Sequence, residues 1–232
     1  KTQFYAQYYN NPNNPEAAIN RSKFQYYDRK LLERRGNIWW YANERINVFA
    51  AIDFAFSLAK KADYSALVVI GIDRNHSIFV LDVVRFKSQA IKGYYDEILK
   101  AYQRWGFRKI RCEINSAQSV IVKDLKDNYI RPNGLLLSID EHNPSRHEGS
   151  KEERIRALLE PKYDNQQIWH YKGGNCEILE DELLLEKPPH DDCKDALAAA
   201  IDICIAPKVS GSNDSPGNFM SDRHIVHSRF GG

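Results

Sequence analysis

The chain has 232 residues, of which 43% are hydrophobic and 28% are charged, so wholesale disorder and a collagen-like repeat are excluded. Its 33 basic and 31 acidic side chains leave a formal charge of +2, which neither demands nor excludes a nucleic-acid partner. No run of about 18 apolar residues occurs and the N-terminal segment lacks the layout of a secretory signal, so we expect no membrane partner.

The first part of the chain, residues 1–45, is rich in Asn, Tyr and Arg. Two Asn-Asn-Pro triplets at 10–15 predict consecutive turns, and the basic stretch at 29–35 is typical of a solvated face. We therefore expect an arm that leads into a folded domain. Because the chain starts with Lys rather than Met, we also expect it to be a piece of a longer protein.

Three apolar segments follow, and their Val, Ile and Phe content predicts strands at 47–53, 65–72 and 77–86. The sequence Asp-Arg-Asn-His at 73–76 favours a tight turn, so the second and third strands should form a hairpin. Three adjacent strands with short connections predict an antiparallel arrangement.

After this point helical and strand patterns alternate. We predict helices at 94–105, 116–129, 151–159, 175–185 and 191–205, and strands at 109–113, 134–139 and 167–171. Pro161 is expected to end the third of these helices. The order predicts an α/β fold, in which a mixed sheet carries helices on both faces. We expect one domain over 46–206 and a flexible Ser- and Gly-rich tail over 207–232.

A few acidic residues stand where solubility does not explain them. Asp53 ends a strand that is apolar throughout, where an isolated carboxylate is costly unless it is paired, protonated or bound to a metal. Glu113 ends another predicted central strand, and Asp192 and Asp195 lie three residues apart at the start of the last helix. Helix capping is an alternative reading for Asp192 and for its neighbour Asp191.

In a mixed sheet of this order, the ends of two adjacent strands and the start of a helix can converge on one place. Carboxylates that meet there would repel each other unless cations lie among them. Ligand sets of oxygen alone favour Mg²⁺ or Mn²⁺, and two such ions about 4 Å apart are a common arrangement for attack on a phosphodiester.

Other candidate sites are weak. The histidines at 142, 170 and 190 are too scattered to form a zinc site together, and we expect them at the surface. The four cysteines share no Cys-x-x-Cys spacing and are expected to be free thiols.

Five motifs carry a resemblance to a known family. They are Ala-Ala-Ile-Asp at 50–53, Lys-Ala-Asp-Tyr-Ser-Ala at 61–66, Cys-Glu-Ile-Asn-Ser-Ala-Gln at 112–118, Gly-Ser-Lys-Glu-Glu-Arg-Ile at 149–155 and His-Asp-Asp-Cys-Lys-Asp-Ala-Leu at 190–197. In this order they resemble the nuclease domain of tailed-phage large terminase subunits, over residues 49–205. The last motif is also similar to Holliday-junction resolvases of the same RNase H-like superfamily.

The resemblance implies a five-stranded RNase H-like sheet, with three antiparallel strands and then parallel crossovers, and two divalent metal ions, Mg²⁺ or Mn²⁺. The catalytic and metal-binding acids that it implies are Asp53, Glu113, Asp192 and Asp195, with Asp191 as a further metal ligand. One ion would activate the attacking water and the other would stabilise the leaving 3′ oxygen. Lys151 and Arg154 would contact DNA phosphates, or else lie on a solvated helix turn beside Glu152 and Glu153.

The function that follows from the resemblance is a metal-dependent endonuclease of viral DNA packaging, which cuts concatemeric double-stranded DNA with little sequence specificity in the host bacterial cytoplasm. Its implied partners are the portal protein, the small terminase subunit and the ATPase domain of the full-length protein. Residues 1–45 would then be the remnant of an interdomain linker. This chain has no Gly-x-x-x-x-Gly-Lys-[Ser/Thr] loop, so we expect no ATP hydrolysis from it. The alternatives are a resolvase-like nuclease and a non-catalytic DNA- or portal-binding module.

Overall fold

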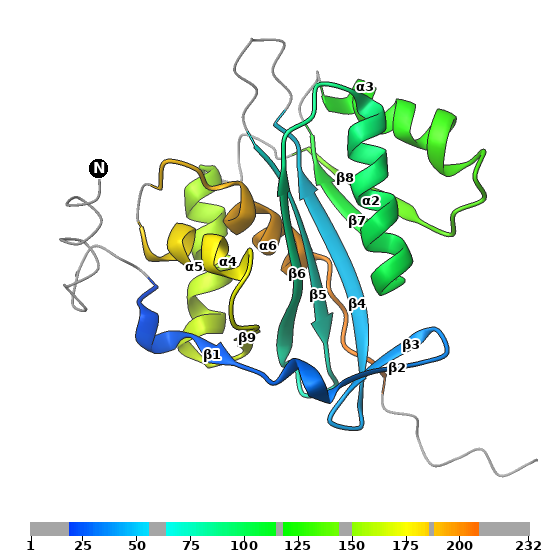
Figure 1. Ribbon diagram of the computed structural model, residues 1–232. Helices are drawn as coiled ribbons and strands as arrows, with labels where there is room; N and C mark the ends of the chain where they lie inside the picture. The colour runs from blue at the N-terminus through cyan, green and yellow to red at the C-terminus, as the bar shows by residue number, and fades with distance from the viewer. Residues whose placement is uncertain (1–18, 56–63, 115–117, 144–149, 186–187, 209–232) are drawn as a thin grey trace, which may run out of the picture.

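The computed structural model describes residues 19–55, 64–114, 118–143, 150–185 and 188–208, and Figure 1 shows their arrangement. Parts of the motifs at 61–66, 112–118 and 149–155 therefore lie outside the described residues, as do residues 1–18 of the predicted arm and 209–232 of the predicted tail. Within the described ranges, no helix combines the length and the apolar character that a membrane span requires.

Three long antiparallel strands form the centre of the sheet, as predicted. They are β4 (Glu44–Asp53), β5 (Ser65–Ile72) and β6 (Ile78–Phe86). The turn between β5 and β6 is held by Asp73, whose Oδ1 accepts hydrogen bonds of 2.8 Å from the backbone N–H groups of Asn75 and Ser77. This side-chain capping of a turn is the reason that Asp favours such positions.

Two parallel strands complete the predicted five-stranded sheet. They are β7 (Lys109–Glu113), which pairs with β4, and β8 (Ser138–His142), which pairs with β7. The connections are helical: α2 (Ile91–Trp105) precedes β7, and α3 (Gln118–Asp124) with a π-helical turn (Leu125–Ile130) precedes β8. The predicted strand at 134–139 begins later, at Ser138, because Gly134 still belongs to a turn and has a φ of 62°.

Four short strands extend the sheet, of which β9 was predicted, as the strand at 167–171, and the other three were not. They are β1 (Gln25–Tyr26), β2 (Leu32–Arg35), β3 (Ile38–Tyr41) and β9 (Ile168–His170). β9 pairs with β6 and β1 pairs with β9, whereas β2 and β3 form a hairpin that continues from β4. Part of the segment that we expected to be an arm is thus sheet, and Tyr27 of that segment is buried and donates to the carbonyl of Val80. The domain boundaries after residues 45 and 206 remain a prediction.

Helices cover both faces of the sheet, because every residue of β5 is buried and both α2 and α6 (Asp192–Asp202) pack against this strand. Figure 1 shows α2 and α3 on one side of the central strands and α4 (Lys151–Asp164) and α5 (Cys176–Leu184) on the other. Helix α6 also lies against β4, and its Ala196 and Ala200 are fully buried.

Pro161 does not end α4, contrary to the prediction. The helix continues to Asp164, with Leu159 and Tyr163 buried on its inner face, and the carbonyl of Pro161 accepts a hydrogen bond from the N–H of Asn165. Proline removes one helical hydrogen bond, but burial of large apolar side chains on either side outweighs that loss. Packing of α4 therefore overrides the helix-breaking tendency of Pro161.

Candidate active site

Two carboxylates and one lysine from three separate elements meet at one edge of the sheet. Asp53 is the last residue of β4, Asp195 lies in the first turn of α6, and Lys151 is the first residue of α4. The Nζ atom of Lys151 lies 3.1 Å from Oδ2 of Asp53 and 2.5 Å from Oδ2 of Asp195. The two acids are therefore within two hydrogen-bond lengths of each other, as the sequence pattern predicted for this pair.

Burial dominates the electrostatics of this pair. The side chain of Asp195 is 3% exposed, and burial raises its pKa to about 7 even though Lys151 opposes the shift. Burial also raises the pKa of Asp53, again against the effect of Lys151. Desolvation works against the ammonium group as well, but the two carboxylates outweigh it and raise the pKa of Lys151. Asp195 Oδ1 is buried and has no hydrogen-bond partner among the described residues.

Glu113 and Arg154 form a second pair beside the first. Arg154 Nη2 lies 3.3 Å from Glu113 Oε1, and its Nη1 lies 3.4 Å from Nε2 of His142. Glu113 and His142 are register partners at the ends of the parallel strands β7 and β8. The charge of Glu113 contributes to the raised pKa of Asp53, so the two acids lie in the same electrostatic environment.

Asp191 belongs to this environment and Asp192 to a different one. Asp191 is the N-cap residue of α6, and its charge contributes to the raised pKa values of both Asp53 and Asp195. Asp192 instead has its Oδ2 3.9 Å from Nη2 of Arg85, and its charge acts on buried groups of α5 and α6. The structure therefore brings Asp53, Asp195 and Glu113 into contact with the basic residues of α4 and places Asp192 toward β6 and α5. Asp191 acts on Asp53 and Asp195 through its charge.

The neighbours of Asp192 include two residues that the sequence analysis missed. Arg85 is aligned with Asp53 across the sheet through Ala66, and its guanidinium lies 4.0 Å from the ring centre of Tyr64. Glu182 of α5 is 4% exposed and accepts a hydrogen bond of 2.9 Å from the backbone N–H of Lys194. An Arg at the end of a buried strand is a signal that could have been noticed, whereas an acid in the helical run around Glu182 looks like a solvated face.

No three of the predicted acids have their ligand atoms within 4.8 Å of one another in the described part of the chain. Lys151, rather than a preformed set of three ligands, occupies the space between Asp53 and Asp195. A group that does satisfy this distance comes from other elements, β9 and α5, and consists of His170, Cys176 and Glu180. The expectation that His170 lies at the surface was wrong, because its side chain is fully buried.

Comparison with known proteins gives matches among solved structures alone, since no protein-family model and no curated protein matches the chain. The large terminase nuclease of the thermophilic phage G20c with bound zinc is 15% identical, with a TM-score of 0.53 over 78% of this chain and 95% of that one. The P22 large terminase nuclease domain is 14% identical, with a TM-score of 0.52 over 79% of this chain and 89% of that one. The nuclease domain of the large terminase subunit gp2 of bacterial virus Sf6 is 13% identical, with a TM-score of 0.50 over 69% of this chain and 89% of that one.

At this level of sequence identity the similarity concerns the architecture of the chain. It agrees with the mixed sheet, in which three antiparallel strands precede two parallel ones, and with the helices on both faces. These matches confirm, at the level of the fold, the resemblance to phage large terminase nuclease domains that the sequence motifs carry. The chain therefore has the RNase H-like fold of phage large terminase nuclease domains.

Proposed function

We propose that this chain is a metal-dependent endonuclease that hydrolyses phosphodiester bonds of double-stranded DNA. The observation that carries the proposal is the pair of Asp195, which is buried, and Asp53, which is partly buried; the two share the single ammonium group of Lys151 at the carboxyl end of β4. A site with more buried negative than positive charge is suited to hard cations.

The donor atoms fit such cations. Asp53, Asp195, Glu113 and Asp191 offer oxygen alone, which favours Mg²⁺ or Mn²⁺ over softer ions. Asp195 Oδ1, buried without a hydrogen-bond partner among the described residues, is an oxygen available to a cation. We propose two ions in this environment; when bound, they would supply charge for activating water and for stabilising the leaving oxygen. Asp192, which the sequence analysis included among the ligands, is proposed to act in positioning α6 through Arg85.

The basic residues of α4 are proposed to bind the DNA backbone. Lys151 and Arg154 are three residues apart in the first turn of α4, so they project from neighbouring positions of one face. With divalent cations held by the carboxylates, the ammonium group of Lys151 would be available to contact a phosphate oxygen. Contacts to phosphates carry no information about bases, which supports cleavage with little sequence specificity.

The biological setting is proposed from the fold. A terminase nuclease would cut concatemeric viral DNA in the host bacterial cytoplasm and would work with the portal protein, the small terminase subunit and the ATPase domain of its full-length protein. The isolated domain is then expected to cleave weakly, because delivery of DNA belongs to the motor.

The test is cleavage of plasmid DNA by the chain with Mg²⁺ or Mn²⁺. We expect Asp53→Asn and Asp195→Asn each to lower the cleavage rate by about 100-fold or more, since each removes a charged ligand of a catalytic ion. Asp202→Asn is the matched control, because Asp202 lies on the same helix α6 but pairs with Arg111. Equal cleavage by the wild type and Asp195→Asn, or none with any divalent cation, would contradict the proposal. Strong preference for four-way junctions over linear duplex would favour a resolvase instead.

A further inference from the structure

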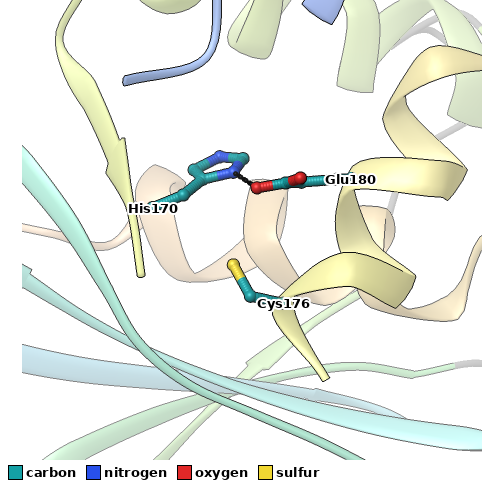
Figure 2. A group of neighbouring side chains, drawn as sticks. All are labelled: His170, Cys176 and Glu180. Atoms are coloured by element: carbon teal, nitrogen blue, oxygen red, sulfur yellow. Dashed lines mark hydrogen bonds and ion pairs between the residues drawn. The ribbon is translucent and has the colours of Figure 1, made fainter. Parts of the chain in front are cut away.

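A second cluster of possible metal ligands lies away from the acids discussed above. His170 of β9 and Cys176 and Glu180 of α5 each offer one ligand atom, and these atoms all lie within 4.8 Å of one another. Figure 2 shows the three side chains converging between the strand and the helix. His170 and Cys176 are fully buried and Glu180 is 5% exposed. Three such polar groups are costly to bury unless each has a partner.

The chain between the strand and the helix brings these residues together. Gly173 and Gly174 both have positive φ angles, of 82° and 58°, and they turn the backbone directly before α5 begins at Cys176. Glycine adopts conformations of this kind without steric cost, because it has no Cβ atom. Glu180 follows Cys176 by one helical turn, so both side chains lie on the face of α5 toward His170.

One hydrogen bond within the cluster and two hydrogen bonds from tyrosines outside it hold these side chains. His170 Nδ1 lies 3.0 Å from Glu180 Oε1, while its Nε2 lies 2.8 Å from the hydroxyl of Tyr163. The hydroxyl of Tyr26 donates to the other oxygen of Glu180, Oε2, at 3.2 Å. An ion between Nδ1, Oε1 and the sulfur of Cys176 would leave both tyrosine hydrogen bonds in place. Metal-bound His and carboxylate side chains characteristically have such supporting hydrogen bonds.

The donor set identifies the class of ion. One imidazole nitrogen, one thiolate and one carboxylate oxygen suit Zn²⁺, in contrast to the oxygen ligands at the other site, which suit Mg²⁺ or Mn²⁺. A cavity of about 510 Å³ is lined by Glu180 and Tyr26, together with Arg21 and Lys172, so the cluster borders this cavity on the side of Glu180, whereas His170 and Cys176 are fully buried.

We propose that His170, Cys176 and Glu180 form a Zn²⁺ site that fastens β9 to α5. Because α5 packs on α6, which carries Asp195, the ion would stabilise the helical layer that supports the carboxylate pair. The proposal is independent of the nuclease function, since it rests on residues that have no part in that site.

Cobalt substitution tests the proposal directly. The full chain is freed of metal with a chelator and titrated with Co²⁺, and we expect a thiolate-to-cobalt charge-transfer band that saturates at one equivalent and disappears when Zn²⁺ is added. Cys176→Ser should lack the band. Cys204→Ser, which alters a half-buried cysteine outside the cluster, should keep it, and so should Asp53→Asn. A wild-type chain without the band, or a band that persists in Cys176→Ser, would overturn the proposal.

A second variant decides the question if Cys176→Ser does not fold. Tyr26 is 36% exposed, so Tyr26→Phe removes the hydrogen bond to Glu180 with little loss of packing. We expect it to weaken Zn²⁺ binding by about tenfold, as the loss of a supporting hydrogen bond commonly does. Unchanged affinity in competition with a chromogenic chelator would count against the site. Loss of the cobalt band in Asp53→Asn would likewise count against the proposal, because Asp53 has no part in this cluster.

Discussion

Lys151 is the side chain that balances the charge of Asp53 and Asp195. Its ammonium group contacts both Asp53 and Asp195, and the raised pKa values of these acids already reflect the cost of their burial. Removal of one partner from a fully buried ion pair costs about 3–5 kcal/mol, because the remaining charge is left without compensation. The ammonium group therefore stabilises the fold in the absence of a divalent cation.

We predict that Lys151→Met lowers the free energy of unfolding by about 2 kcal/mol without divalent ions. This is less than for a fully buried pair, since the Lys151 side chain is 37% exposed. Urea unfolding measures the loss, and added Mg²⁺ should restore part of it by compensating the same carboxylates. Lys126→Met, which breaks the surface pair with Glu141, serves as the control and should change stability by less than about 1 kcal/mol. A Lys151→Met protein as stable as the wild type would contradict this assignment of charge.

We expect Glu182 to make the stability of the folded protein depend on pH. Burial raises its pKa from 4.5 to about 7, although the hydrogen bond from Lys194 and the charge of Arg85 oppose the shift. Between these two pH values the unfolded chain loses the proton while the folded chain keeps it, so stability falls as the pH rises, by up to about 1.4 kcal/mol per unit. Above pH 7 both states are ionised and the loss is complete.

Glu182→Gln removes this titration and is expected to gain stability relative to the wild type as the pH rises. The difference between the two proteins should grow by about 1–3 kcal/mol between pH 5 and pH 7 and then stay constant. Chemical denaturation of both proteins at a series of pH values measures it. A difference that does not change with pH over this interval would show that Glu182 ionises normally in the folded protein.

Individual site residues were predictable to the extent that a local rule applied to them. Asp53 was found because it ends an apolar strand, and Asp195 because it lies in an apolar helix. The separation of Asp192 from this pair depends on Arg85, a residue far away in the sequence, and no spacing rule contains that contact. Likewise, the burial of His170 depends on three elements that meet only in the folded chain.

Helix α4 shows how the start of an element can fix functional side chains. Ser150 accepts a hydrogen bond from the N–H of Glu153, and the Glu153 side chain accepts one from the N–H of Ser150. This capping box satisfies two N–H groups that would otherwise lack helical partners. Because Lys151 and Arg154 lie in the same turn, the cap also fixes the positions of these two basic side chains at the site.

We predict that Ser150→Ala destabilises the protein by about 1 kcal/mol through loss of the cap. Fraying of the first turn should also slow DNA cleavage, since Lys151 and Arg154 would lose their fixed positions. Thermal unfolding and the plasmid assay measure the two effects. Ser138→Ala, at an exposed strand position, is the control. Full stability in Ser150→Ala would indicate that packing alone sets the start of α4.

Elements with a strong pattern of their own were predicted, and those that depend on distant partners were not. The strands β4, β5 and β6 are long and apolar, and their pattern is clear in the sequence. By contrast, β1 has two residues and exists through pairing with β9, which lies more than a hundred residues later in the chain. The continuation of α4 through Pro161 has the same cause, because packing against the rest of the protein decides it.

The arrangement of the complete fold explains why the acids meet. β4 and β7 are adjacent and parallel, so Asp53 and Glu113 emerge at the same edge of the sheet, and α6 lies against β4 with its N-terminus at this edge. The sequence predicted this topology because strand order follows from short connections and from helical crossovers. The pairing of β1 to β3 with the sheet was beyond such rules. β1 and β2 are short and largely polar and resemble an arm, and the pattern of the apolar β3 does not identify its partner strands.

The buried alanines of α6 have a consequence for this arrangement. Ala196 and Ala200 are fully buried, and so are Ala51 and Ala66, which lie on the face of β4 and β5 that also carries Asp53. Methyl groups on both surfaces let the helix backbone approach the sheet closely, and Asp195 adjoins the first of them. The small alanine side chains between α6 and the sheet thus set the distance between Asp195 on the helix and Asp53 on the strand. A leucine in place of Ala196 would push α6 away from the sheet and increase the distance between Asp195 and Asp53. Every acid would then be present, but the two would lie too far apart to share a cation.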